Sequence, residues 1–441
     1  MDQTLERRTI RKISWRLLPL IVIIYFVAYV DRTNVSFASF GMTRDLGLDA
    51  YVYGWGAGIF FLGYFLFEVP SNLMLERFGA RRWIARIMIS WGIMAGLTAF
   101  SRGGTSFIIL RFLLGATEAG FFPGIILYLT YWFPKAYRAR VISALFLAVP
   151  GSNAATAAVS TAILQLDGAW GLPGWQWLYV VEALPAILLA FVVLAALTER
   201  PADAAWLDAD EKAWLEGRLA AERRALEERG QPPQGRLRAL LDRRVLILAL
   251  IYLTIVTATY GITFFLPLII KSLGATEAET GLLTAVPYVV GTVGMVLWAI
   301  SSDRKGERRW HYIVACLVGA AGLALAARIG GSWWALVAMS VATIGIYGAK
   351  PSFWPLPSEF LTGTAAAGGI ALVNSIGNLG GFFGPYVVGW IKQSTDGYEG
   401  GLYFLAGCAL ASAVIAFFTI QPRAGMPAPA ALEPMAPGRS A

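Results

Sequence analysis

Two short charged segments share one pattern, and the rest of the chain can be interpreted from them: ERFGARR at residues 76–82 and DRKGERR at residues 303–309. In both, an acid and an arginine are followed by a glycine and then by two basic residues at the same spacing. Each segment follows a long apolar run that is the second of six in its half of the chain. A parallel repeat of this kind is typical of transporters that bind a substrate between two similar halves.

The apolar runs are long enough to cross a membrane as helices, which takes about 20 residues. The chain is 57% hydrophobic and only 15% charged, whereas a soluble domain carries about 25% charged residues. Twelve spans are predicted: 17–37, 55–73, 83–100, 105–133, 141–164 and 178–197 in the first half, and 245–270, 282–300, 312–327, 333–360, 365–391 and 402–420 in the second. The predicted fold class is therefore an all-α membrane protein with twelve transmembrane helices in two six-helix pseudo-repeats.

Basic residues gather in alternate loops, which indicates the orientation because Lys-rich and Arg-rich loops stay in the cytoplasm. Clusters occupy residues 7–16, 77–82, 135–140 and 304–309, and the polar stretch between the halves lies on the same side. The opposite side has only scattered single basic residues. Both termini are therefore predicted to be cytoplasmic, in a multi-pass protein of a bacterial inner membrane.

The same pattern divides the chain into four segments. These are an N-terminal six-helix bundle (1–198), a cytoplasmic linker (199–244), a C-terminal six-helix bundle (245–421) and a disordered tail rich in Ala and Pro (422–441). Within the linker, residues 208–229 are predicted to form an amphipathic helix on the membrane surface, followed by a Gln-Pro-Pro break at 231–233.

Several function classes are excluded by what the sequence lacks. His311 is the only histidine, and Cys316 and Cys408 both lie in apolar runs, so a metal site, a catalytic triad and a disulfide framework cannot be assembled. The net charge of +8 comes from loop clusters and does not indicate a nucleic-acid-binding face. No nucleotide-binding loop is present, so we expect neither an enzyme nor a cofactor.

Both charged loops resemble the conserved loop of the major facilitator superfamily, roughly Gly-x-x-x-Asp-Arg-x-Gly-Arg-Arg. The first copy departs from that pattern, because Ser71 or Asn72 stands near the usual glycine and Glu76 replaces the aspartate. The resemblance implies that the loops help to close the cytoplasmic side, through Glu76, Arg77, Arg81, Asp303, Arg304 and Arg308. The alternative is that these loops only anchor the topology.

Three further strings resemble the anion:cation symporter family within that superfamily: YVDRTNVS at 29–36, RFLLGATEAGFFP at 111–123 and NSIGNLGG at 374–381, followed by Gly384-Pro385. The likeness covers nearly the whole chain, and the aromatic-acid and tartrate permeases are the most similar members. It implies that Asp31 and Glu118 are proton-coupling carboxylates and that Arg32 helps to hold a substrate anion.

Charged residues inside the predicted spans are candidates in their own right, since each costs at least about 2.5–3.5 kcal/mol to insert and such residues usually face a cavity or a partner. Asp31 and Arg32 are adjacent on a helix and so face different partners, although a structural pair at the outer interface is the alternative. Burial disfavours the charged form of Glu118, as proton carriage requires. Arg111 lies about 10 Å earlier on the same face and is the predicted charge partner of Glu118, in an exchanging or a fixed salt bridge.

Lys350 falls well inside the tenth span, where a lone cation is a natural ligand for a carboxylate. The alternatives are that it neutralises a buried acid or that its side chain extends to the cytoplasmic surface. Neutral polar groups complete the predicted site: Asn374 and Asn378, four residues apart on one helix face, and Tyr260. Ser152 and Asn153 are placed either in the cavity or in helix contacts, and Glu182 is either a further charge partner or a cap at the outer end of its helix.

The predicted function is import of a small organic acid anion together with protons, by alternating access. Relatives place a polar substrate ligand near Val149, where this chain is apolar, which favours a less hydroxylated or aromatic acid. The alternative is a proton-coupled exporter, although residues 146–159 lack the Gly-x-x-x-Gly-Pro stretch of such exporters. The expected partners are a carboxylate, protons and the lipid bilayer, and the protein is expected to be a monomer.

Overall fold

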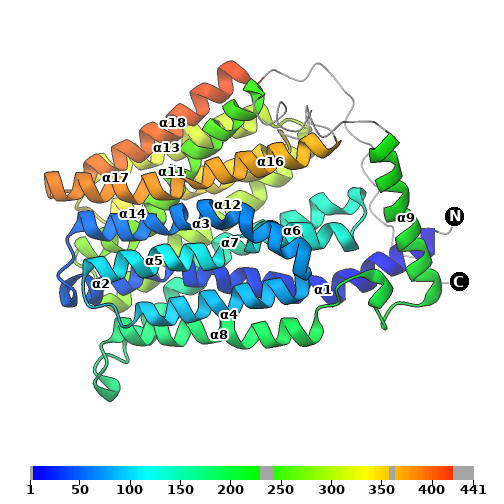
Figure 1. The fold of residues 1–441 in the computed structure, drawn as a ribbon. Helices are drawn as coiled ribbons and strands as arrows, with labels where there is room; N and C mark the ends of the chain where they lie inside the picture. Colours follow the sequence, from blue (N-terminus) through cyan, green and yellow to red (C-terminus); the bar gives the residue numbers. More distant parts are fainter. Residues whose placement is uncertain (1–2, 229–241, 357–362, 421–441) are drawn as a thin grey trace, which may run out of the picture.

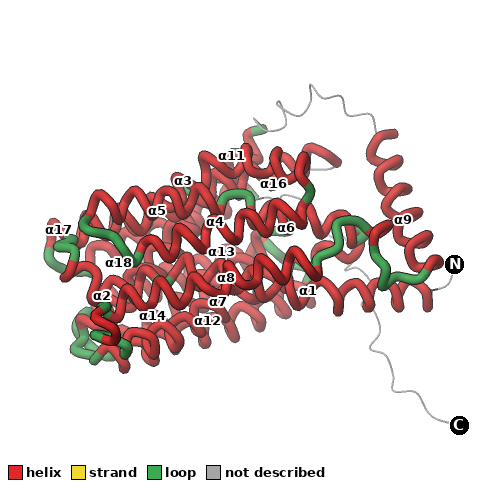
Figure 2. The backbone as a smooth tube through the Cα atoms, turned by 60° about the horizontal axis from the view of Figure 1, so that its bottom comes forward, coloured by secondary structure: helices red, strands yellow, loops and turns green. Residues whose placement is uncertain are grey.

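The computed structural model describes residues 3–228, 242–356 and 363–420, and within these ranges the chain is helical, with short connections and no strand. The long helices lie side by side along one direction of the molecule (Figure 1). The turned view in Figure 2 shows the same parallel arrangement, with loops gathered at the two ends of the bundle. Such an arrangement satisfies every backbone hydrogen bond within a helix, as a lipid environment requires.

The first half of the chain supplies α1 (Gln3–Thr33), α2 (Val35–Asp45), α3 (Ala50–Phe78), α4 (Ala80–Thr98), α5 (Gly104–Glu118), α6 (Phe121–Trp132), α7 (Lys135–Leu164) and α8 (Gly174–Ala196). Two single turns of 3₁₀ helix, Ala169–Gly171 and Pro201–Asp203, flank α8. Each of the first six predicted spans falls on one of these helices or on a consecutive pair. The two pairs are α1 with α2 and α5 with α6.

The linker supplies α9 (Ala209–Glu228), and the second half supplies α11 (Arg243–Ser272), α12 (Glu277–Lys305), α13 (Arg309–Ile329), α14 (Trp334–Phe353), α16 (Gly363–Asn378), α17 (Gly380–Thr395) and α18 (Glu399–Thr419). Among the described residues, eight helical segments are long and apolar enough to cross a membrane. The full count of twelve spans and the cytoplasmic termini stay predictions. The Gln-Pro-Pro break, the end of the tenth span and the tail lie outside the described residues.

The predicted span at 105–133 is not one continuous helix, because it is interrupted at Ala119 and Gly120 between α5 and α6. Gly120 has a φ of +83°, a left-handed conformation that side chains rarely adopt. A β-carbon there would also overlap the Ser71 side chain of α3. The break makes Glu118 the last residue of α5, in the interior of the bundle.

The two halves meet closely at the end of the bundle where α3 begins. Gly54 of α3 lies against the Pro385 carbonyl of α17, and Gly389 of α17 lies against the backbone of Ala50. A side chain at either glycine would collide with the backbone opposite. The Tyr53 hydroxyl donates a hydrogen bond of 3.0 Å to the carbonyl oxygen of Phe264 in α11. This end of the molecule is therefore closed in the structure.

At the other end, α9 lies across the ends of the long helices beside the N-terminus (Figure 1). The Glu211 carboxylate accepts hydrogen bonds from Arg8 Nε and Lys12 Nζ, both at 2.9 Å, and its side chain is inaccessible to solvent. Burial alone would raise the pKa of Glu211, but hydrogen bonds from Lys12, the Asp208 backbone N–H and Arg8 outweigh burial. The pKa therefore lies below its ordinary value.

Candidate functional site

A pocket lies between the two halves, midway along the bundle. Its lining comes from both: Tyr25 and Arg32 of α1, Tyr64 of α3, Phe121 and Phe122 of α6, Val149 of α7, Tyr252, Thr259 and Tyr260 of α11, Met295 of α12, Tyr347 and Lys350 of α14, and Asn374 and Asn378 of α16. About 40 Å³ of free space remains, enough for only a few water molecules. A larger solute therefore needs the lining side chains to move apart.

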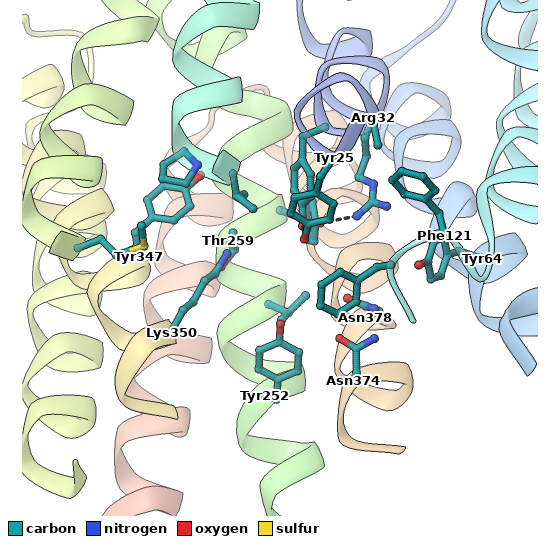
Figure 3. A pocket seen from close by; sticks show the side chains of 18 residues that line it. Tyr25, Arg32, Tyr64, Phe121, Tyr252, Thr259, Tyr347, Lys350, Asn374 and Asn378 are labelled. Carbon is teal, nitrogen blue, oxygen red and sulfur yellow. Dashed lines mark hydrogen bonds between the residues drawn. The ribbon is translucent and has the colours of Figure 1, made fainter. Parts of the chain in front are cut away.

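Arg32 is the central cation of the pocket. Its guanidinium forms an ion pair with Glu118 through Nη2 and donates a hydrogen bond of 3.1 Å from Nη1 to the Tyr260 hydroxyl. Four aromatic rings surround it, and those of Tyr29 and Phe60 have their centres 4.9 and 5.1 Å from its Cζ. Such rings attract a cation through their negative faces. In Figure 3 the Arg32 side chain points into the pocket, and a dashed line marks its hydrogen bond.

Glu118 reaches this pair because α5 ends there, while its side chain is completely buried. One carboxylate oxygen binds Arg32, and the other has no hydrogen-bond partner. Removing one member of a buried ion pair leaves an uncompensated charge, which is strongly unfavourable. Protonation of Glu118 would leave the Arg32 guanidinium as that uncompensated charge, which another anion could neutralise.

Asp31 does not line the pocket. It faces α4, where its Oδ2 accepts a hydrogen bond of 2.8 Å from the indole N–H of Trp91, and its Oδ1 has no partner. The sequence argument that Asp31 and Arg32 serve different partners agrees with this geometry. Its proton-coupling role stays a prediction.

Arg111 is not paired with Glu118 in this conformation. Its guanidinium is fully buried and donates to two carbonyl oxygens of α3, from Nε to Gly56 at 3.3 Å and from Nη2 to Ala57 at 3.5 Å. Glu118 instead binds Arg32, which comes from a different helix. The sequence could not reveal this choice, because spacing along α5 says nothing about the neighbouring helices. An exchange of partners during transport stays a prediction.

Lys350 is the second cation of the pocket and comes from the last turn of α14. Its Nζ lies 4.9 Å from the centre of the Tyr347 ring, and within the described part of the chain it makes no ion pair or hydrogen bond. Tyr347 is itself held by a hydrogen bond of 2.9 Å from Asn153 Nδ2 of α7. Figure 3 shows Arg32 and Lys350 entering from opposite sides.

Glu68 of α3 was missed by the sequence argument, although it lies inside the second predicted span. It is buried at the junction of the halves and accepts hydrogen bonds from Ser375 Oγ at 2.6 Å and Asn374 Nδ2 at 3.4 Å. Asn374 and Asn378 both line the pocket, as Figure 3 shows. The signal that could have revealed Glu68 is the cost of placing any carboxylate inside an apolar span.

The repeated charged loops make their contacts within their own halves in the described structure. Arg308 forms an ion pair of 2.6 Å with Asp303 and donates to Ser302. In the first half, the backbone N–H groups of Ala80 and Arg81 donate to the carboxylate of Glu199. Closure of the cytoplasmic side by Glu76, Arg77, Arg81, Asp303, Arg304 and Arg308 stays a prediction.

A bundle of apolar helices in two halves, with a charged pocket between them, defines a membrane transporter and not an enzyme. The chain belongs to the Major Facilitator Superfamily, whose family model matches residues 21–385.

Individual relatives carry different names. A protein of Agrobacterium vitis that is provisionally named a tartrate transporter is 50% identical over 93% of this chain and 91% of its own. The "Quinolone resistance transporter" of Acinetobacter baumannii is 40% identical over 91% of this chain and 92% of its own. A solved D-xylose–proton symporter superimposes with a TM-score of 0.73 at 18% identity, covering 92% of this chain and 98% of its own. The solved structure bears on the fold alone.

Proposed function

We propose that this transporter imports a small organic acid anion together with protons, by alternating access across a bacterial inner membrane. The observation that carries the proposal is Lys350, a pocket cation with no acidic partner among the described residues. A cation in a water-poor site needs a counter-charge. A substrate carboxylate supplies one.

Arg32 provides the link to protons. In the described conformation Glu118 occupies its guanidinium. When a proton from outside neutralises Glu118, Arg32 becomes available to a substrate carboxylate. When the proton leaves toward the cytoplasm, the restored carboxylate competes for Arg32 and displaces the substrate. Substrate and proton therefore enter together, and net charge in the pocket stays low as the halves rock.

The positions of the two cations favour a dicarboxylate. Arg32 and Lys350 enter the pocket from opposite sides (Figure 3), so one molecule with a carboxylate at each end can engage both. The name of the Agrobacterium vitis relative fits this class, since tartrate is a dicarboxylate. The apolar side chain of Val149 in the lining favours a substrate with few hydroxyl groups. Tartrate has two hydroxyl groups and fits this part of the pocket less well.

A second candidate is proton-coupled export of a drug or metabolite, favoured by the name of the Acinetobacter baumannii relative. An exporter of cationic or zwitterionic compounds is expected to offer an acid to its cargo. In this pocket the acid Glu118 is already bound to Arg32, and Lys350 repels cations. The charge of the site therefore favours an anion.

Uptake by the purified protein in proteoliposomes tests the proposal. A panel of labelled tartrate, succinate, lactate and an aromatic monocarboxylate is offered under an inward proton gradient, with protein-free vesicles as the control. We expect gradient-driven accumulation of a carboxylate. Among the compounds tested, a dicarboxylate should half-saturate uptake at the lowest concentration. If no carboxylate accumulates and quinolones are expelled instead, the protein is an exporter and the proposed import is wrong.

A further inference from the structure

A second group of buried polar residues lies in the N-terminal half, outside the pocket described above. Glu182 of α8, Ser160 of α7 and Asn34 at the junction of α1 and α2 are 4%, 0% and 0% exposed. None of the three lines the pocket. The mechanism proposed above makes no use of them.

Glu182 has only half of its hydrogen-bonding capacity filled. Its Oε1 accepts a hydrogen bond of 2.6 Å from Ser160 Oγ, whereas its Oε2 is buried without a partner. The Asn34 side chain lies within hydrogen-bonding reach of Glu182, but among the described residues neither its amide oxygen nor its amide nitrogen forms a hydrogen bond of regular geometry. Unfilled polar atoms are rare in protein interiors, and each needs an explanation.

No cation neutralises Glu182 in the described part of the chain. The titratable groups that face it are Asp31 from α1 and Tyr179 one turn earlier on α8. The helices α1, α2, α4 and α7 pack against α8. Of these, α7 presents the neutral Ser160 to Glu182, and the neutral Trp91 of α4 donates to Asp31. An ionised carboxylate there would be a buried charge with an acid as its nearest charged neighbour, which is strongly unfavourable.

A proton on Oε2 fills two of these three vacancies at once, those of Oε2 and of the Asn34 amide oxygen. The resulting O–H can donate to the Asn34 amide oxygen, while Oε1 keeps its bond from Ser160. Asn34 is two residues after Arg32, at the point where α1 gives way to α2. A movement of the α1 backbone that accompanies the transfer of Arg32 from Glu118 to a substrate would therefore also reach the residue that holds the proton of Glu182.

We propose that Glu182, with Ser160 and Asn34, forms a second proton-binding site whose proton is carried inward with the substrate. This rests on the proposed function, because it assigns one of the symported protons to a place in the chain. The proton arrives from the outer side, binds to Oε2 and leaves to the cytoplasm as a proton, so no other reactant is needed. Arg32 and the junction at Asn34 connect this site to the pocket.

Infrared difference spectroscopy of the purified protein tests the site without any substrate. Spectra are recorded on raising the pH for the native chain, Glu182→Gln and the control Glu216→Gln, whose side chain is exposed on α9. We expect the carbonyl band of a protonated carboxyl in the native chain and in Glu216→Gln, and its loss in Glu182→Gln. The same band in all three proteins overturns the proposal.

The number of protons per substrate tests whether that proton moves. In Glu182→Gln, the accumulation ratio at zero membrane potential should fall by about tenfold under a tenfold proton gradient, as the loss of one coupled proton requires. An unchanged ratio means that Glu182 holds a fixed proton, and overturns the transport step. So does accumulation that follows a sodium gradient and not a proton gradient.

Asn34→Leu provides a second infrared test of the site if Glu182→Gln does not fold. Removing the acceptor of the O–H should shift the carbonyl band to higher frequency, and an unshifted band contradicts the proposed hydrogen bond. Failure of the proposed function is distinguishable. If the native chain carries no carboxylate, the transport step is overturned, while the infrared result still decides whether Glu182 binds a proton.

Discussion

Two groups compete for the guanidinium of Arg32: the carboxylate of Glu118, which holds it in the structure, and the carboxylate of the proposed substrate. Glu118→Gln keeps the shape of the side chain but can neither carry a proton nor displace a bound anion. We expect gradient-driven accumulation to be lost, while exchange of labelled for unlabelled substrate across the membrane survives. Uptake and counterflow measured in the same proteoliposomes check this. Accumulation that persists in Glu118→Gln would falsify the coupling role.

Lys350 should contribute to affinity and not to coupling. Replacing it with methionine keeps the length of the side chain but removes a hydrogen bond between charged groups, which is worth about 1.5–3 kcal/mol. We therefore expect the dissociation constant of a dicarboxylate to rise by roughly tenfold to a hundredfold. Titration of the purified protein by calorimetry measures it. Lys271→Met is the matched control, because Lys271 pairs with Glu277 at the end of α11, outside the pocket. Equal affinity in both variants contradicts the role of Lys350.

The sequence could identify candidate residues at this scale but not their partners. Arg32 and Lys350 stood out because a charge inside an apolar span is costly, and both line the pocket. The partner of Glu118 could not be predicted, since it depends on how α1 packs against α5. Glu68 was not predicted, because it lies outside the strings that resemble a known family.

At the scale of elements, two helices touch through glycine at the closed end of the bundle, which is the predicted outer end. Gly54 of α3 lies against the Pro385 carbonyl of α17. Gly54→Val would place side-chain atoms where the backbone of α17 now lies, so the two helices cannot approach and the outer end stays open. We expect transport to stop while the pocket becomes reachable from outside.

Labelling measures this opening. Thr259 of the pocket lining is changed to cysteine in a chain whose two cysteines are replaced by serine, and a membrane-impermeant maleimide is added outside. We expect faster labelling in Gly54→Val than in the parent. Gly407→Val serves as the control, because a β-carbon at Gly407 meets no atom within 4 Å. Labelling that is equally slow in both variants would mean that the contact between α3 and α17 does not hold the outer end shut.

The sequence predicted where the helices lie, but it did not predict every point at which a helix is interrupted. Within the described residues, each predicted span falls on one helix or on two consecutive helices, because long apolar runs have few other stable conformations in a membrane. The break at Gly120 was not predicted, because an isolated glycine in an apolar run is also compatible with a continuous helix. The requirement for glycine there also depends on the approach of Ser71, a contact between residues far apart in the sequence.

At the scale of the whole molecule, α9 is attached to the N-terminal half. Its described side-chain contacts run to Arg8 and Lys12 of α1, to α7 through Glu222, and to the Ala202 carbonyl. We infer that α9 moves with the N-terminal half when the halves rock. The helix itself was predicted at 208–229, but its attachment to α1 was not, because it depends on charges some 200 positions apart.

Glu211→Gln tests that attachment. The amide cannot form the ion pairs with Arg8 and Lys12, whose exposed side chains keep the contribution of these pairs to stability small. Amide hydrogens of α9 should therefore exchange about fivefold faster in the variant at neutral pH. Because the pKa of Glu211 is lowered in the folded protein, its contribution is complete above the ordinary value of about 4.3 and is lost as the pH falls through the lowered pKa. The native chain and Glu211→Gln should thus differ at pH 7 and converge in strong acid, whereas Glu216→Gln, on the exposed face of α9, should match the native chain throughout. If exchange in α9 is the same in all three proteins at pH 7, the ion pairs do not hold α9 in place, and packing of its apolar side chains must do so.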